Sequence, residues 1–499
     1  MSGQGREHRS EERARSGAPR GSEPGTPTSA PEQTYDVVVL GAGSSGENVA
    51  DIVVRGGLTA VLVESELVGG ECSYWACMPS KALLRGTEVL TEARAVDGAR
   101  QAVIGEHDVA ATLARRDSFT SLWDDAGQVE WVDRAGIDLI RGTGRLDGER
   151  TVVVTADDGT QTRLTARHAV AVCTGSAAAV PPIEGLRDID PWTPREATSA
   201  KEVPGRLLVV GGGVVGCEMA AAWSALGSRV TLVELGERLL PPLESAAGEV
   251  VASSLREAGV EVRLGTGVTA ARREGGEVVL TTDGGELRGD EVLVAVGRRA
   301  RTGDAGVDTV GLEPGKYLDV DNTLQVVGLP WLYGVGDVNG RRQLTHMGKY
   351  QARQAGAAIV ARARGEEVDT SDWSPFVATA DEHATPSVVF TIPQVAGVGR
   401  TSTEAEKAGL PHRVVEIPLK VAGSSLFADG YEGTAIAVVD TDREVLLGLT
   451  FIGPAVGELL QAATIAVVGE VPIRRLWHAV PAYPTVSEIW LRLLEAYRG

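Results

Sequence analysis

Short apolar runs separated by glycine-rich turns dominate the pattern of this chain. Residues 35–40 form a β-branched, apolar run, which is typical of a strand buried in a parallel sheet. A glycine-rich turn and a helical stretch follow, and residues 60–64 form a second such run. The same order of strand, glycine-rich turn, helix and strand occurs again, with a strand over 206–210, a helix over 217–226 and a strand over 229–234. This repeat predicts two βαβ units in an α/β chain.

Each unit places glycines and an acid where a dinucleotide needs them. The first glycine permits a tight turn, the second lets backbone amides approach a pyrophosphate, and the third lets the helix pack close to the strand. In both copies the acid follows the first glycine by 23 residues. The predicted binding residues are Gly41, Gly43, Ser45, Gly46 and Glu64 in the first copy, and Gly211, Gly213, Gly216 and Glu234 in the second. The alternative is a pair of glycine-rich turns without ligands.

Each glycine-rich turn together with its acid is called a cradle here, and two cradles predict two bound dinucleotides. A carboxylate at Glu234 would repel a 2′-phosphate, which favours NAD(H) over NADP(H) in the second cradle. Arg238 lies close enough in the sequence to leave NADP(H) as the alternative.

Length and charge narrow the class of protein. A chain of 499 residues is too long for one core and predicts several domains. The net charge of −20 argues against nucleic acid and anionic membrane surfaces as partners. No apolar run reaches the roughly 18–20 residues of a membrane span, and the start has no signal-peptide core. Four cysteines are too few for a disulfide scaffold, so a reducing cytoplasm is expected.

Two segments differ in composition from the rest. Residues 1–33 contain five Arg and five Glu but no Val, Ile, Leu or Phe, which predicts a disordered tail. Residues 365–375 are rich in Asp, Ser, Gly and Pro and are predicted to be a linker.

The pair Cys72 and Cys77 carries the most distinctive chemistry. Cysteines five apart on a regular helix have Cα atoms about 8–9 Å apart, whereas a disulfide needs about 4.4–6.8 Å. A bridge between them therefore requires a local distortion, and strained, reachable disulfides are the catalytic ones. Two inert buried thiols are the alternative, and a metal site is not expected because no paired histidines accompany them. Cys173 and Cys217 are predicted core residues.

The segment from Gly69 to Lys81 reads GGECSYWACMPSK and resembles the redox motif of the pyridine nucleotide–disulfide oxidoreductases. Further motifs follow in the order of that flavoprotein family, from about residue 34 to the end. They include Thr174-Gly175, Gly297, Gly336-Asp337 and Pro484-Thr485 with Glu488.

The resemblance implies two Rossmann-like domains and an α+β dimerisation domain. The implied parts are a FAD-binding domain (34–190), an NAD-binding domain (191–300), a FAD-binding central region (301–372) and a dimerisation domain (373–499). It also implies FAD and NAD(H) as cofactors, a small-molecule substrate and a homodimer.

The resemblance also assigns roles to single residues. Cys77 would face the flavin and Cys72 would exchange with the substrate. Lys81 would lie near the flavin and pair with Glu218, for which a surface ion pair is the alternative. The remaining cofactor-binding residues would be Glu64 at the FAD ribose, Asp337 at the ribitol, and Gly70, Thr174, Gly175, Gly297 and Gly336 along the cofactors.

The chain departs from the family at one position. The family's His-Pro-Thr-x-x-Glu signature reads Tyr483-Pro-Thr-Val-Ser-Glu488 here. Tyrosine has a pKa near 10 against about 6.5 for histidine, so Tyr483 is a poor general base. Ordinary disulfide exchange is thereby put in question, although Tyr483 and Glu488 remain the expected residues at this place.

The sequence therefore predicts a FAD-dependent oxidoreductase that takes electrons from NADH. The main hypothesis sends them through Cys72 and Cys77 to a disulfide or thiol-bound substrate. The alternatives are a diaphorase, quinone reductase or transhydrogenase that bypasses the dithiol, and a flavin-bearing structural subunit.

Overall fold

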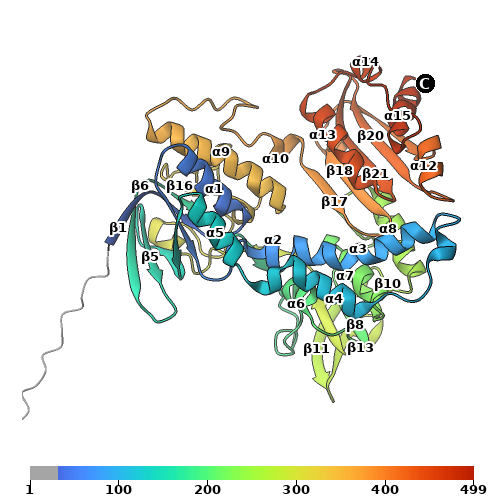
Figure 1. Ribbon diagram of the computed structural model, residues 1–499, viewed down its shortest axis with the longest axis horizontal. Coiled ribbons are helices and arrows are strands. Elements are labelled where there is room, and N and C mark those ends of the chain that lie inside the picture. Colours follow the sequence, from blue (N-terminus) through green and yellow to red (C-terminus); the bar gives the residue numbers. More distant parts are fainter. Residues whose placement is uncertain (1–31) are drawn as a thin grey trace, which may run out of the picture.

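The computed structural model describes residues 32–499. In Figure 1 the first lobe lies at the left, the C-terminal lobe at the upper right, and a third unit below the C-terminal lobe, so that the C-terminal sheet is set apart from the first sheet. No helix in the described range is long and apolar enough to cross a membrane. The predicted tail lies outside this range except for Glu32 and Gln33.

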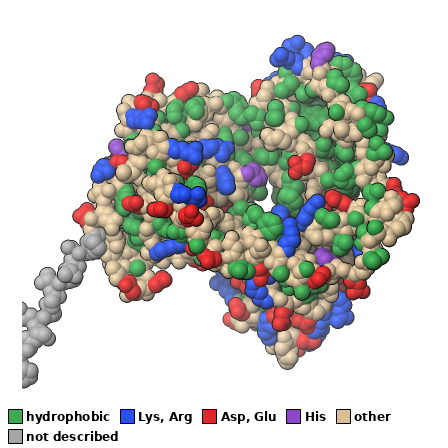
Figure 2. All heavy atoms as spheres, in the orientation of Figure 1, with side chains coloured by type: hydrophobic (Ala, Val, Ile, Leu, Met, Phe, Trp, Pro, Cys, Tyr) green, Lys and Arg blue, Asp and Glu red, His purple; other side chains and the backbone are tan. Residues whose placement is uncertain are grey.

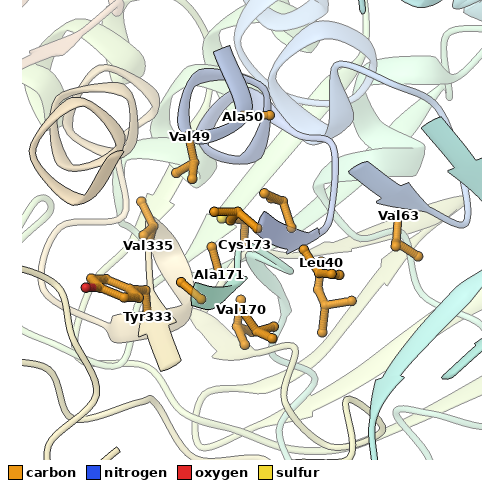
Figure 3. Close-up of a cluster of buried hydrophobic side chains, with 14 of the residues drawn as sticks. Leu40, Val49, Ala50, Val63, Val170, Ala171, Cys173, Tyr333 and Val335 are labelled. Atoms are coloured by element: carbon orange, nitrogen blue, oxygen red, sulfur yellow. The ribbon is translucent and has the colours of Figure 1, made fainter. Parts of the chain in front are cut away.

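The first lobe is built on a seven-stranded sheet in the order β3-β2-β1-β6-β5-β4, with β16 beside β6. Its strands are β1 (Glu32–Leu40), β2 (Ala60–Glu64), β3 (Asp138–Arg141), β4 (Thr143–Leu146), β5 (Thr151–Thr155), β6 (Gln161–Val172) and β16 (Leu332–Gly334). Its main helices are α1 (Ser44–Arg55), α5 (Ala126–Arg134) and α9 (Thr345–Ala363). Buried valines and alanines of β1, β6, α1 and α9 form its core, part of which Figure 3 shows.

The second unit repeats the βαβ design in a parallel sheet of order β10-β9-β8-β14. Its strands are β8 (Arg206–Val210), β9 (Arg229–Val233), β10 (Glu261–Arg263) and β14 (Glu291–Val294), with helices α7 (Val214–Ala225) and α8 (Ser245–Glu257). An antiparallel sheet of β11 (Val268–Glu274), β12 (Glu277–Thr282) and β13 (Gly285–Gly289) adjoins it, and β7 (Ser176–Ala178) pairs with β15 (Arg298–Ala300).

The C-terminal lobe is an antiparallel sheet in the order β17-β18-β21-β20-β19. Its strands are β17 (Pro386–Val389), β18 (Gln394–Gly399), β19 (His412–Pro418), β20 (Thr434–Asp440) and β21 (Val445–Gly453). Its helices are α10 (Ala380–His383), α11 (Ser402–Lys407), α12 (Ala422–Phe427), α13 (Leu460–Val468), α14 (Ile473–Leu476) and α15 (Ile489–Arg498). This sheet shares a core with the second unit, because Val389 and Ile452 pack in the same cluster as Trp223.

The remaining helices connect these units. They are α2 (Gly70–Tyr74), α3 (Cys77–Arg94), α4 (Val109–Phe119) and α6 (Pro194–Ser199). In Figure 1, α3 runs along the base of the C-terminal lobe, and Figure 2 shows the surface hollowed between that lobe and the first one. Helix α3, which begins at Cys77, therefore extends from the redox segment to the C-terminal lobe.

The predicted elements are confirmed with shifted ends. Strand β1 begins at Glu32 rather than at residue 35, because the main chain of Glu32 to Tyr35 pairs with β6 although its side chains are polar. The helix predicted over 217–226 runs from Val214 to Ala225, and Asp337 begins a short 3-10 helix after β16. Cys173 and Cys217 are buried, as predicted.

Candidate active site

The two glycine cradles have nearly the same backbone geometry. Gly41 and Gly211 both adopt left-handed φ angles, 96° and 111°. A Cβ on Gly46 would lie 1.9 Å from the carbonyl oxygen of Gly41, and a Cβ on Gly216 would lie 1.9 Å from that of Gly211. Only glycine allows each helix to approach its strand this closely, which is the role predicted for the third glycine.

The acid of each cradle binds the same two backbone positions. Glu64 accepts hydrogen bonds from the amides of Ala42 (2.7 Å) and Glu66 (2.8 Å). Glu234 accepts them from Gly212 (2.5 Å) and Gly236 (2.7 Å). Both carboxylates are thus fixed beside their glycine-rich turns, where the ribose of a dinucleotide would lie.

The middle glycine of each cradle leaves room for a ligand. The nearest atom to a Cβ on Gly43 is 3.9 Å away, and none lies within 4 Å of one on Gly213. No side chain caps α1 or α7, so their first amides point freely out of each helix start. Free amides at a helix N-terminus favour a phosphate. The residues present therefore fit a pyrophosphate in both cradles.

The first cradle opens into a pocket that is continuous with solvent. Most of the first-lobe residues predicted to bind a cofactor line it, namely Gly41, Gly43, Ser45, Glu64, Gly70, Thr174, Gly175 and Asp337, together with Cys72. Its lining of glycines, hydroxyl groups and carboxylates suits a dinucleotide such as FAD. Gly46, Gly297 and Gly336 do not line it: Gly46 packs beneath the turn, and Gly336 donates its amide to buried Gln351.

Asp337 is held at the end of this pocket by two partners. It accepts a hydrogen bond from Ser176 Oγ (2.6 Å), and its carboxylate lies 3.6 Å from Arg298 Nε. Arg298 also donates to the Ser176 side chain and carbonyl. Ser176 and Arg298 directly follow the predicted residues Gly175 and Gly297 and were not themselves predicted as site residues; the pairing of β7 with β15 brings them together.

The helix carrying the redox motif is broken between the two cysteines. Helix α2 ends at Tyr74 and α3 begins at Cys77, while Trp75 and Ala76 between them have non-helical backbones. This break confirms the predicted local distortion. All four cysteines of the described chain are free thiols. The structure thus shows Cys72 and Cys77 as a dithiol.

The surroundings of Cys77 favour its thiolate. The hydrogen bond from Cys72 lowers the pKa of Cys77 to about 6, against the opposing effect of burial. Thr345 Oγ1 lies 3.2 Å from the Cys77 sulfur and contributes in the same direction, as does the charge of Lys81. Thr345 is the first residue of α9, so the positive end of that helix also faces the sulfur.

Lys81 and Glu218 form the predicted pair. Lys81 Nζ lies 2.7 Å from Glu218 Oε2, and Glu218 is only 3% exposed. The other carboxylate oxygen accepts the amide of Phe390 at 2.9 Å. A surface ion pair was the alternative interpretation, and the burial of Glu218 argues against it. The pair therefore connects α3, α7 and the C-terminal lobe at one point.

The aromatic residues between the cysteines are packed into the protein. Tyr74 is buried and donates to the Val68 carbonyl. The guanidinium of Arg195, from α6, lies 4.2 Å from the centre of the Trp75 ring. Arg195 also pairs with Glu71 at 2.5 Å, which holds the redox segment against α6. No sequence signal pointed to Arg195, which is 120 residues beyond Trp75.

Tyr483 and Glu488 lie away from this pocket within one protomer. Tyr483 is 77% exposed, and Glu488 accepts the backbone amide of Gly423 at 3.1 Å. Neither residue lines the pocket that contains Cys72. One protomer alone therefore does not bring them to the dithiol.

Two family models match this chain. Pyridine nucleotide-disulphide oxidoreductase matches residues 35–356, and the dimerisation domain of the same family matches residues 385–493. The chain belongs to the pyridine nucleotide-disulphide oxidoreductase family, and it is a flavoprotein disulfide oxidoreductase of the dihydrolipoyl dehydrogenase type. The dimerisation domain implies a homodimer.

Relatives in this family carry more than one activity. Dihydrolipoyl dehydrogenase of Haloferax volcanii is 31% identical over 476 residues, which cover 93% of this chain and 96% of the relative. Mercuric reductase of Acidithiobacillus ferrooxidans is 30% identical and covers 91% of this chain and 81% of its own. The family uses FAD and a pyridine nucleotide. Because relatives with different activities are about equally similar to this chain, the sequence identity does not determine its substrate.

Solved structures share the fold. The HOCl-induced flavoprotein disulfide reductase RclA from Escherichia coli has a TM-score of 0.79 at 22% identity, over 93% of this chain and 99% of its own. LpdA from Mycobacterium tuberculosis has a TM-score of 0.78 at 24% identity, over 94% and 99%. These likenesses confirm the α/β architecture with its antiparallel C-terminal sheet.

Proposed function

We propose that this protein passes electrons from NADH through FAD to the Cys72–Cys77 pair and on to a small disulfide or thiol-bound substrate. The observation that carries the proposal is the position of the dithiol on the cradle pocket. Cys72 lines that pocket, and Cys77 contacts Thr345, which lines it too. Bound FAD would accept a hydride from the nicotinamide and deliver two electrons to the disulfide.

The side chains around the dithiol divide the work between the two sulfurs. Cys77, with its lowered pKa, holds the negative charge that remains after reduction. Cys72, which is partly accessible, is the thiol that attacks the substrate. Lys81, fixed by Glu218, supplies a cation where negative charge develops on reduction.

The second cradle favours NADH over NADPH in this proposal. Glu234 presents a carboxylate where the 2′-phosphate of NADPH would have to lie. Arg238, the residue that could have countered it, donates to the carbonyls of Pro241 and Leu243. Its guanidinium is therefore already bound to the backbone.

An anaerobic titration of the purified protein with NADH tests the proposal. A long-wavelength band after two electrons is expected, because a Cys77 thiolate would face oxidised flavin. Cys72→Ser should abolish reduction of disulfide substrates. Bleaching of the flavin without that band would show that the dithiol is bypassed.

A second candidate function is direct reduction of a quinone or another acceptor. The exposed Tyr483 favours it, since no histidine occupies that place to serve the interchange thiol. NADH oxidation with a quinone that survives Cys72→Ser would support this candidate over the first.

A further inference from the structure

The break between helices α2 and α3 is present although its two cysteines are not joined. Cys72 and Cys77 are free thiols, so no covalent bond imposes the non-helical backbones of Trp75 and Ala76. Pro79 supplies a local cause, because a proline has no amide to donate to the carbonyl four residues earlier and its ring crowds that carbonyl. That carbonyl belongs to Trp75. The break therefore leaves a main-chain carbonyl that needs another donor.

Two side chains from other parts of the fold donate to the carbonyls at the break. The Thr198 hydroxyl, on α6, lies 2.8 Å from the Trp75 carbonyl. The hydroxyl also lies 2.9 and 3.1 Å from two carbonyls of α6, but amides of that helix can donate to these, whereas Pro79 leaves Trp75 without such a donor. The indole N–H of Trp123 donates to the preceding carbonyl, that of Tyr74, at 3.1 Å. Both carbonyls are thus bound from outside the redox segment.

Helix α6 is itself anchored at both ends. Thr193 and Glu196 form a capping box at its start. At its end, the guanidinium of Arg116 donates to the carbonyls of Thr198 (2.6 Å) and Ala200 (2.9 Å), and Arg116 is fully buried. A buried cation has to keep its hydrogen-bond partners, so these carbonyls are held in place. The Thr198 hydroxyl is therefore presented to the break from a fixed helix.

The same helix also holds the ring at the break. The Arg195 guanidinium lies 4.2 Å from the centre of the Trp75 ring and pairs with Glu71 in α2. In Figure 1, α4 and α6 lie below α3, and both contact that helix. Neither Thr198 nor Trp123 lines the flavin pocket. These two side chains therefore act on the backbone of the break and not on the walls of the pocket.

We propose that α6 and Trp123 form a brace, which holds the backbone between Cys72 and Cys77 in the broken conformation that a disulfide requires. Thr198 and Trp123 are positioning residues in this scheme, since they bind the main chain rather than either sulfur. The inference rests on the redox role of the pair in the proposed function.

The brace favours the disulfide over the dithiol. On oxidation each thiol loses one electron and one proton, and a bond forms between the two sulfurs. A disulfide accepts only a narrow range of Cα separations, about 4.4–6.8 Å. Without the brace the dithiol gains backbone conformations that the disulfide cannot adopt, so the equilibrium moves toward the dithiol.

The test measures the equilibrium between the Cys72–Cys77 dithiol and its disulfide. The flavin-loaded protein is equilibrated without oxygen in dithiothreitol buffers, in which oxidised dithiothreitol accepts the two electrons and two protons. The exchange is quenched with acid, free thiols are alkylated, and the disulfide fraction is measured by peptide mass spectrometry. In Thr198→Val the equilibrium constant for disulfide formation should fall about tenfold, which is about 30 mV for two electrons. Thr198→Ser should restore it, and Trp123→Phe should lower it as Thr198→Val does.

The matched control is Thr91→Val, which removes a hydroxyl from the far end of α3, where Thr91 Oγ1 donates to the carbonyl of Thr87 in its own helix at 2.9 Å. It should leave the equilibrium constant unchanged. A constant in Thr198→Val that is equal to or above that of the wild type, or an equal fall in Thr91→Val, would overturn the inference. If Thr198→Val does not fold, an unchanged constant in Trp123→Phe would overturn it instead.

The same experiment separates the brace from the proposed function. Because dithiothreitol replaces both NADH and the substrate, the equilibrium does not depend on how electrons reach the pair. Bleaching of the flavin by NADH without the long-wavelength band, together with an intact Thr198→Val shift, would refute the proposed function alone.

Discussion

The buried pair of Lys81 and Glu218 gives the sharpest energetic prediction. Their charged atoms are 2.7 Å apart, so the Coulomb attraction at an effective dielectric constant of 20 is about 6 kcal/mol. Most of this is offset, because Glu218 has left water while the Lys81 side chain is still 36% exposed. A hydrogen bond to a charged group contributes about 1.5–3 kcal/mol net. We therefore expect a coupling energy of about 2 kcal/mol.

A double-mutant cycle measures this coupling. The free energy of unfolding in urea is compared for the wild type, Lys81→Met, Glu218→Gln and the double variant, all loaded with FAD. Lys81→Met should lose more stability than half of the double variant, since it leaves the Glu218 carboxylate buried without its cation. The amide of Phe390 should also exchange with solvent faster in Glu218→Ala, because it loses its acceptor.

The matched control is an exposed pair. Arg492 and Glu495 are 2.8 Å apart on α15, but their side chains are 54% and 44% exposed. Their cycle should give about 0.5 kcal/mol or less. A coupling between Lys81 and Glu218 no larger than this would refute the reasoning, since burial of Glu218 is its whole basis.

Further predictions concern charge, the cradle and the missing histidine. The long-wavelength band of the NADH-reduced protein should disappear as pH falls through about 6, the lowered pKa of Cys77. The free energy of unfolding that this thiolate contributes is complete above pH 9.0, the ordinary pKa of a cysteine. It is lost as pH falls through about 6. Gly43→Ala should keep the fold and weaken FAD binding, which a lower flavin content of the purified protein would show. Gly46→Ala should instead destabilise the first lobe, because its Cβ would lie 1.9 Å from a backbone oxygen, and a lower midpoint of thermal unfolding would show this. Tyr483→His should raise kcat for a disulfide substrate at pH 7 by about 10²-fold or more, and an unchanged kcat would show that proton transfer there is not limiting.

The spacing of residues within each βαβ unit was enough to predict the two glycine cradles. The strands, turns and acids of each βαβ unit lie within about 30 residues, and their spacing alone determines the close approach of Gly46 to its turn. The break between Tyr74 and Cys77 also followed from local geometry, because a regular helix cannot bring the two sulfurs together. The resemblance then placed Lys81 beside Glu218.

Contacts between distant segments could not be predicted. Arg195 reaches Trp75 only because α6 folds back against the redox segment, and Phe390 meets Glu218 only because the C-terminal sheet shares a core with the second unit. Likewise, β1 extends to Glu32 through main-chain pairing, to which its polar side chains give no clue. The pattern of apolar residues in a sequence indicates which side chains are buried. Hydrogen bonding between the main chains of two strands leaves no such pattern in the sequence.

The arrangement of charge separates the two sulfurs of the dithiol. Lys81 is held by buried Glu218, and its charge contributes to the lowered pKa of Cys77. The neighbouring Cys77 and burial raise the pKa of Cys72 instead. Negative charge is therefore favoured on Cys77, and Cys72 is the neutral thiol of the pair.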